Sequence, residues 1–478
     1  MKPTLPWILP LLLLTACATA PERTAVDDLP QPAVWSADAD TNAPPVEAWW
    51  SQLGSTGLVA AVDEALQGNH DLRQALARID AAAAQARIFG ADAYPQVGFG
   101  FDAARQQQVF VGLPIPGREN QPLQTRFTSF AGSFNLSWEL DVWGRIRASQ
   151  SAALADVQAS EADFRGAVQS LAAQTCRGWV GLVAAEQQLR LARATAESFT
   201  ITAAQVGERY RRGLRGALDY RLALNNASVA RALVALRERE LQTARRQLEV
   251  LLGRYPQGAI TGDAALPAIP DAVPAGLPSE LLERRPDLAA AERRLAANIA
   301  RVKEAKRALL PRISLTAGAG RTSSELEDLL DNNFSVWSLA GNFAQPLFQG
   351  GRLRANVKLN EARAREALEG YHSTVLRAFG EVEVALDSEA QLRRREADLA
   401  DATAQSAEAQ RLAEERYFAG LIEFITLTET QRNAYNTEAE LITIRRQRLE
   451  NRIDLHLALG GGFPAETPQL ARLADPEE

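Results

Sequence analysis

The spacing of hydrophobic residues along the chain changes abruptly at two prolines. Residues 69–94 have helical spacing, but beyond Pro95 apolar residues alternate with small or polar ones. The apolar set there is Val97, Phe99 and Phe101, and the intervening set is Gly98, Gly100 and Asp102. Pro311 marks the same change, with Ile313, Leu315 and Ala317 alternating with Ser314, Thr316 and Gly318. A period of two is typical of a β-strand, so each proline predicts a junction between helix and strand.

Two further stretches alternate in the same way and complete one hairpin in each half of the chain. The first has an apolar face made of Phe130, Gly132, Phe134, Leu136, Trp138 and Leu140. The second has Trp337, Leu339, Gly341 and Phe343. The predicted hairpins cover about 95–140 and 311–347, with strands of about ten residues, which suits a tilted strand that crosses a bilayer. Small, hydroxylated residues on the opposite faces favour a water-filled lumen over a soluble sheet packed on helices.

The two hairpins belong to an internal duplication. Residues 69–101 match 285–318, with Asp71 and Pro95 each 216 positions before their counterparts. From Gly144 onward the offset is 207, and it pairs Tyr210 with Tyr417 and Gly253 with Gly460. The first half therefore carries nine extra residues. We place them in 105–124, a polar segment rich in proline and glycine that reads as a loop.

Long helices are predicted over most of the remaining chain. A helix predicted from Val142 to about Arg212 has about 70 residues and a length of about 105 Å. A shorter one follows the turn at 213–216 and runs to Gly253, and a third covers Ser279 to Leu310. The second half repeats this with a long helix at 352–419 and short ones at 423–459 and 56–93. Two long helices flanked by stacked pairs of short ones describe a helical tube, with segments 21–50, 254–278 and 463–478 forming a belt around its middle.

Four strands per chain are too few to close a barrel, and lipid does not tolerate open sheet edges. Three chains would supply twelve strands. We therefore predict a mainly α fold with a transmembrane β-barrel, in which duplicated helix–hairpin–helix halves form a trimeric 12-stranded barrel continued by a long α-helical barrel. The predicted division of the chain is a signal peptide at 1–16, a lipidated segment at 17–54, repeats at 55–253 and 279–462, a linker at 254–278 and a tail at 463–478.

The first residues predict export and a lipid anchor. One lysine, a short apolar run and small residues precede Cys17, which is the anatomy of a cleaved export signal. Leu14-Thr15-Ala16-Cys17 resembles the bacterial lipobox, whose cysteine is acylated, and Ala18 after it suggests sorting to the outer membrane. An ordinary signal peptide with an incidental cysteine is the alternative. We interpret Cys176, the only other cysteine, as a small buried hydrophobic residue.

Composition and motifs predict no catalytic activity and no binding of nucleic acid or metal. A net charge of -7 excludes a nucleic-acid partner that needs a basic face. His70, His372 and His456 lie far apart, without ligand spacing, and are interpreted as surface or interface residues rather than metal ligands. No nucleophile or phosphate-binding motif is present. We expect a passive conduit that is not an enzyme and that uses no metal and no cofactor.

Several ordered motifs resemble the outer-membrane efflux protein family, the TolC-like exit ducts of tripartite pumps, and specifically its lipoprotein branch. They are WWSQLG (49–54), SWELDVWGRIR (137–147), RRPDLAAAERRL (284–295), PLFQGGRLR (346–354) and LALGGG (457–462). The resemblance implies a homotrimer that passively conducts drugs or other small molecules from the periplasm to the exterior. Its implied partners are a periplasmic adaptor protein, a proton-driven inner-membrane transporter of the resistance-nodulation-division type and outer-membrane lipid.

The same resemblance implies a gate and an adaptor-binding tip at the two turns remote from the barrel. Ile425, Glu429 and Arg432 fall on one helical face, and Glu429 with Arg432 otherwise reads as a solvated surface ion pair. The family pattern also assigns Asp219 to the gate, while Thr426 stands where some relatives carry an acid. The implied tip consists of Tyr210, Gly213, Leu214, Tyr417, Gly420 and Leu421.

A different class of function stays open at this point: a lipid-anchored structural coiled-coil protein of the cell envelope, without a channel. The alternating hairpins favour the duct, because a spacer needs no strands with small polar faces. A cell-wall enzyme is a distant third hypothesis, since the chain lacks any catalytic set.

Overall fold

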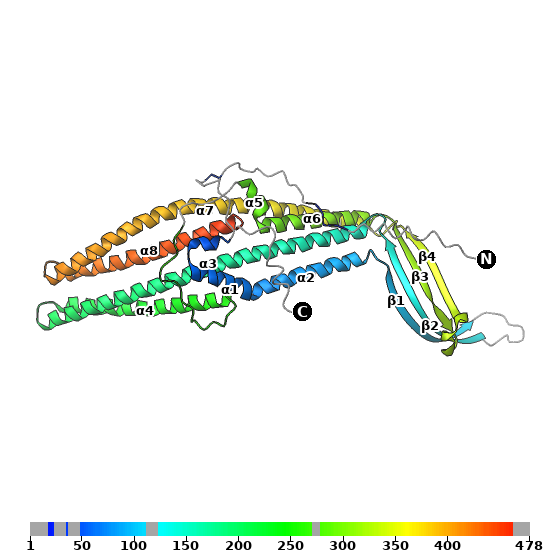
Figure 1. Cartoon of the computed structure of the whole chain (residues 1–478), viewed down its shortest axis with the longest axis horizontal. Helices are drawn as coiled ribbons and strands as arrows, with labels where there is room; N and C mark the ends of the chain where they lie inside the picture. Colours follow the sequence, from blue (N-terminus) through cyan, green and yellow to red (C-terminus); the bar gives the residue numbers. More distant parts are fainter. Residues whose placement is uncertain (1–17, 23–34, 37–47, 111–122, 270–277, 462–478) are drawn as a thin grey trace. The chain divides into compact units, whose positions relative to one another are not determined.

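The computed structural model describes residues 18–22, 35–36, 48–110, 123–269 and 278–461. These residues form helices and one four-stranded sheet (Figure 1). The chain divides into two compact units, each described by itself below. The sheet unit contains Ile79–Ala159 and Ala291–Gly370, and the hairpin unit contains Val26–Arg78, Ser160–Ala290 and Tyr371–Glu478.

The sheet is antiparallel and follows the order of the sequence (Figure 1). Its strands are β1 (Gln96–Phe110), β2 (Leu123–Leu140), β3 (Arg312–Ser323) and β4 (Ser335–Ala344). Phe99 pairs with Phe134, Leu136 with Ala317, and Ala317 with Leu339. Because paired residues share a face, the predicted apolar positions of all four strands lie on one side of the sheet.

The first hairpin is longer than the sequence predicted. β1 and β2 have 15 and 18 residues, against 12 and 10 in β3 and β4. The loop placed at 105–124 was wrong at both ends, where residues 105–110 and 123–124 are strand. Polar side chains support each other across the ladder there: Gln107 donates to the Gln124 side chain over 3.0 Å, and Arg126 donates to Gln107 over 2.9 Å. The polar residues at these two ends therefore belong to strands rather than to a loop.

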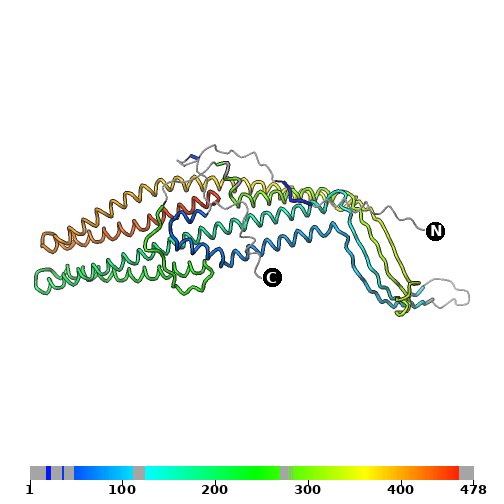
Figure 2. Tube along the Cα trace, viewed as in Figure 1, coloured from blue at the N-terminus to red at the C-terminus, as the bar shows by residue number. Residues whose placement is uncertain are grey.

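The long helix and the short helix that follows it have the same lengths in both repeats. α3 (Arg145–Arg211) and α7 (Arg352–Phe418) have 67 residues each. α4 (Ala217–Leu251) and α8 (Phe424–Ala458) have 35 residues each and run back along them (Figure 2). No helix within the described residues is both long and apolar enough to cross a membrane.

The other two predicted helices are each interrupted once. Residues 56–93 form α1 (Thr56–Gly68) and α2 (His70–Ala91), and the 279–310 segment forms α5 (Pro278–Arg284) and α6 (Pro286–Arg307). Asn69 causes the first break, because its side chain accepts hydrogen bonds from the backbone N–H groups of Asp71 (2.8 Å) and Leu72 (3.3 Å) and so caps α2. Pro286 causes the second, since it has no N–H to continue a helix.

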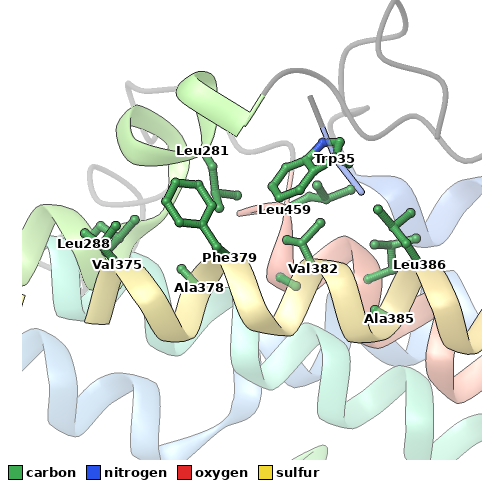
Figure 3. Close-up of a cluster of buried hydrophobic side chains, with 12 residues drawn as sticks. Trp35, Leu281, Leu288, Val375, Ala378, Phe379, Val382, Ala385, Leu386 and Leu459 are labelled. Carbon is green, nitrogen blue, oxygen red and sulfur yellow. The ribbon is translucent and has the colours of Figure 1, made fainter. Parts of the chain in front are cut away.

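A hydrophobic cluster in the hairpin unit joins α7 to α5, α6 and the end of α8 (Figure 3). Trp35 packs edge-on against Phe379, with ring centroids 6.2 Å apart. Leu281, Leu288 and Leu459 complete the cluster from the other elements. Cys176 is fully buried and free, as predicted, and burial raises the pKa of its thiol above the usual range.

Candidate functional site: the two helical turns

The turns that join α3 to α4 and α7 to α8 have the same geometry. The N–H of Gly213 donates to the carbonyl of Tyr210 over 2.9 Å, and the N–H of Leu214 donates to that of Arg209 over 2.9 Å. The second turn repeats these bonds 207 residues later, at 3.0 and 2.9 Å. Gly213 and Gly420 have φ of 73° and 80°, the left-handed conformation that this type of helix end requires. The glycines thus fix both turns through backbone conformation.

Aromatic and aliphatic side chains pack beneath the second turn. Tyr417 is fully buried and lies against Phe424, with ring centroids 5.7 Å apart. Leu427 is also fully buried, and small residues of α3 and α4 close the cluster, among them Ala203 and Ala223. This core holds α8 at the start of its path.

Arginines of the first turn bind the second turn. The guanidinium of Arg209 donates to the carbonyl of Phe418 over 2.8 Å and lies 5.4 Å from the centre of that ring. Arg215 lies 4.8 Å from the centre of the Tyr417 ring, within the range of a cation–π contact. Burial raises the pKa of Tyr417, and the neighbouring Arg215 opposes that shift. The two turns therefore form one connected site.

The predicted tip residues divide into exposed and supporting positions. Leu214 and Leu421 are 67% and 74% exposed, so both offer apolar surface. Tyr210 is half-exposed and stacks on Tyr220 at 5.5 Å. Tyr417, its counterpart in the second repeat, has no exposed surface. Of the predicted tip residues, the two leucines and Tyr210 thus present side-chain surface to solvent, whereas Tyr417 is part of the packing of the turn.

The predicted gate residues lie along the exposed face of α8. Ile425, Thr426, Glu429 and Arg432 are all exposed, and Asp219 on α4 is half-buried. Arg432 Nη1 lies 3.4 Å from Glu429 Oε1, with both side chains about 60% exposed. An exposed pair of this kind contributes only a few tenths of a kcal/mol. The pair is therefore free to exchange for other partners.

Three side chains that the sequence analysis did not single out connect the elements of this site: Arg209, Arg215 and Gln431. Gln431 is buried and donates to Glu414 on α7 over 3.1 Å and to Thr202 on α3 over 3.4 Å. Arg215 could have been noticed because the second repeat has Ile422 at the equivalent position, whereas Arg209 is matched by Arg416 and gives no such signal. Gln431 carries no comparable signal, since its role depends on three helices meeting.

The histidines have different environments. His70 is exposed, whereas His456 is buried, so its interpretation as a surface or interface residue was wrong. The imidazole of His456 stacks on Trp49, with ring centroids 4.9 Å apart and planes at 5°. Among the described residues, no group of three or more His, Cys, Asp or Glu side chains is placed to hold a metal ion.

A family model described as outer membrane efflux protein matches residues 61–254 and 277–461, which cover both repeats. The chain belongs to the outer membrane efflux protein family. The pyoverdine export outer membrane protein OpmQ of Pseudomonas putida is 33% identical over 96% of this chain and 98% of its own length. Outer membrane protein OprJ of Pseudomonas aeruginosa is 35% identical over 95% and 94%. The solved outer-membrane channel OprN is 28% identical, with a TM-score of 0.82 over 93% of this chain and 99% of that one.

Membership in this family confirms the predicted fold class and function. The protein is an outer-membrane channel of an efflux system and not an enzyme. The part of the chain that the structure describes is mainly helical and has four strands, as expected. A spacer without a channel is therefore rejected.

Proposed function

We propose that three copies of this chain form a passive exit duct through the outer membrane. The supporting observation is the sheet, whose two outer strands, β1 and β4, each pair on one side only within the described residues. β1 and β4 run in opposite directions, so β4 of one copy can pair antiparallel with β1 of the next. Three copies would close twelve strands and satisfy every backbone group that lipid cannot.

The apolar face of the sheet supports insertion of this barrel in lipid. Phe99, Trp337, Leu339 and Phe343 are between 64% and 82% exposed in one chain. Large aromatic and aliphatic side chains exposed to this degree need a partner, which acyl chains provide. The opposite face has serine, threonine and asparagine, including Ser133, Asn135 and Thr316, and would line a water-filled lumen.

The mass of the detergent-solubilised protein tests this assembly. One chain has a mass of 51.9 kDa before removal of any signal peptide. Light scattering corrected for bound detergent should give three times the mass of the processed chain. A folded, monodisperse monomer would contradict the proposal.

We infer that the two turns face the pump. The first turn offers arginines and Leu214 and the second offers Leu421, so a periplasmic adaptor would bind by charge at the first turn and by apolar contact at both. The adaptor would connect the duct to an inner-membrane transporter of the proton-driven resistance-nodulation-division type, which supplies the energy. The gate would consist of Asp219, Ile425, Thr426, Glu429 and Arg432, repeated around three chains.

The lipid anchor is the remaining part of the proposal. Cys17 lies outside the described residues, and its support is the lipobox sequence alone. Acyl chains on Cys17 would add to the attachment that the barrel provides. The cargo is proposed only as drugs or other small molecules. Siderophores are included because a relative has a name that refers to pyoverdine export.

A further inference from the structure

A cavity of about 610 Å³ lies within the sheet unit, where α3, α6 and α7 approach the first residue of β3. Its walls carry four arginines, Arg145, Arg301, Arg312 and Arg352, and one carboxylate, Glu304. Alanines make up much of the remaining lining, so the guanidinium groups have room around them. The cavity has the volume of a site for a drug-sized molecule, and its charged side chains favour an anion.

The duplication provides an internal comparison for two of these arginines. Arg145 and Arg352 are equivalent, at the start of α3 and of α7. Arg145 Nη2 lies 2.9 Å from Glu139 Oε1, so its charge is balanced within the chain. At the position equivalent to Glu139 the second repeat has Pro346, and Arg352 donates instead to the neutral amide oxygen of Gln349 over 2.7 Å. Both repeats thus have the cation, but only the first has the carboxylate.

Arg301 and Arg312 also differ in whether a carboxylate balances their charge. Arg301 forms an ion pair with Asp156 of α3. Arg312 has no carboxylate partner in the described part of the chain and is exposed. Two guanidinium groups, those of Arg312 and Arg352, thus line the cavity with their charge unbalanced by an ion pair. Each offers a planar fork of N–H donors that matches carboxylate, phosphate or sulfonate oxygens.

The alternation of the sheet indicates which side this cavity faces. Arg312 pairs with Ala344 and lies on the face of Ser314 and Thr316, opposite Ile313. That polar face lines the lumen in the proposed barrel. An anion in the cavity would therefore come from the stream of cargo, because lipid contacts the other face.

We propose that this cavity is a binding site for soluble organic anions on their way through the duct, with Arg312 and Arg352 as the primary ligands. The inference rests on the proposed function, since it assigns the polar face to the lumen. It narrows the cargo to molecules that carry a carboxylate, phosphate or sulfonate group. The carboxylate of Glu304 repels a bound anion and so weakens its binding. Weak binding suits a conduit, because the cargo must leave the site again.

Binding of the trisulfonated dye pyranine to the intact, detergent-solubilised protein tests this site by fluorescence anisotropy. The double variant Arg312→Gln/Arg352→Gln should bind the dye about tenfold more weakly, because two charge-assisted contacts are lost. Glu304→Gln should bind it more tightly. Arg354→Gln is the matched control, since Arg354 lies on the same helix but does not line the cavity, and it should leave binding unchanged. Equal affinity of the double variant and the natural protein would overturn the proposal.

Two further measurements separate this proposal from others. Pyranine affinity should be the same in nanodiscs of phosphatidylcholine and of phosphatidylglycerol; displacement by the anionic lipid would assign the cavity to a headgroup and reject soluble cargo. Mass and single-channel conductance of the double variant test the duct independently, so a conducting trimer with unchanged dye binding would reject only the anion site. Arg352→Gln alone, at an exposed helix start, provides a second variant if the double variant misfolds.

Discussion

The side-chain amide of Asn69 donates a hydrogen bond to the backbone carbonyl of Leu251 over 3.0 Å. The second repeat makes the equivalent contact with a different residue, because Arg285 Nη1 donates to the carbonyl of Ala458 over 2.9 Å. In each repeat the side chain at the break between two short helices thus holds the last turn of that repeat's 35-residue helix. The carbonyls at a helix end have no partner within the helix, so these bonds satisfy them.

Removing the side chain of Arg285 should lower the free energy of unfolding more than removing that of Asn69. Asn69→Ala loses a helix cap and one bond to Leu251, worth about 1–2 kcal/mol. Arg285→Ala should lower stability more, because Arg285 is buried and also pairs with Asp287 and Glu381, both at 2.8 Å. Thermal melting followed by circular dichroism measures both. Arg78→Ala, which removes an exposed side chain bonded only to Gln74 among the described residues, is the control and should melt like the natural protein.

Glu249 on α4 and His456 on α8 occupy equivalent positions near those helix ends but contact different segments of the chain. Glu249 accepts hydrogen bonds from the backbone N–H groups of Gly258 (2.6 Å) and Ala259 (2.7 Å) in the linker after α4. His456, its counterpart 207 residues later, stacks on Trp49 in the segment before α1. Burial, with Arg452 nearby, lowers the pKa of His456 to about 4. The imidazole is therefore neutral when it stacks.

Stability should fall as the pH drops below 6.5. In the unfolded chain His456 takes up a proton near its ordinary pKa of 6.5, whereas the folded chain binds it only near 4. The unfolded state thus binds more protons between these values, and the free energy of unfolding should decrease by about 2 kcal/mol between pH 7.5 and 5. Urea midpoints at the two pH values measure this. In His456→Phe, which keeps an aromatic ring against Trp49, that part of the pH dependence should disappear; an unchanged dependence would place its source elsewhere.

Periodicity and duplication predicted the elements well, but not the contacts between distant segments. The alternation after Pro95 and Pro311 identified the four strands found among the described residues, because one face of a sheet differs from the other in polarity. The breaks at Asn69 and Pro286 were missed because helical spacing continues across them. Burial of Tyr417 but not of Tyr210 was also hidden, since it depends on which side chains of other elements pack on each tyrosine. The gate and tip roles remain predictions from family resemblance, and the structure adds the side chains that hold those positions.

Substitution by alanine should be more harmful at Gly213 than at Gly216, in the same turn. Gly213→Ala places a Cβ in open space but at φ of 73°, so the change should cost about 1 kcal/mol of backbone strain and disturb the turn. Gly216→Ala is a matched control in the same turn, because φ there is -75° and the added Cβ also meets nothing within 4 Å. Melting temperature and efflux of a fluorescent dye from cells should decrease for Gly213→Ala only. Equal effects of the two variants would show that the positive φ is not what matters.

The proposed lipid anchor predicts a chemical signature at Cys17. Cys17→Ser should abolish incorporation of a fatty-acid probe, because the acylated thiol is gone. Since the barrel provides its own attachment, efflux should fall only in part. Cys176→Ser serves as the control for labelling, as Cys176 is buried within the fold. Persistent labelling of Cys17→Ser would refute the lipobox interpretation.

The proposed gate predicts that single-channel conductance depends on side chains of α8. A duct between periplasm and exterior would leak if its pump-facing end stayed open, so charged and apolar side chains on α8 should narrow it at rest. Glu429 and Arg432 are exposed and bound to each other at 3.4 Å, which leaves both able to contact a neighbouring chain. Glu429→Ala combined with Arg432→Ala should therefore raise single-channel conductance in planar bilayers and sensitise cells to large antibiotics. Glu408→Ala with Arg411→Ala removes another exposed i,i+3 pair, from α7, and should leave conductance unchanged. Unchanged conductance in a folded Glu429/Arg432 double variant would place the constriction elsewhere.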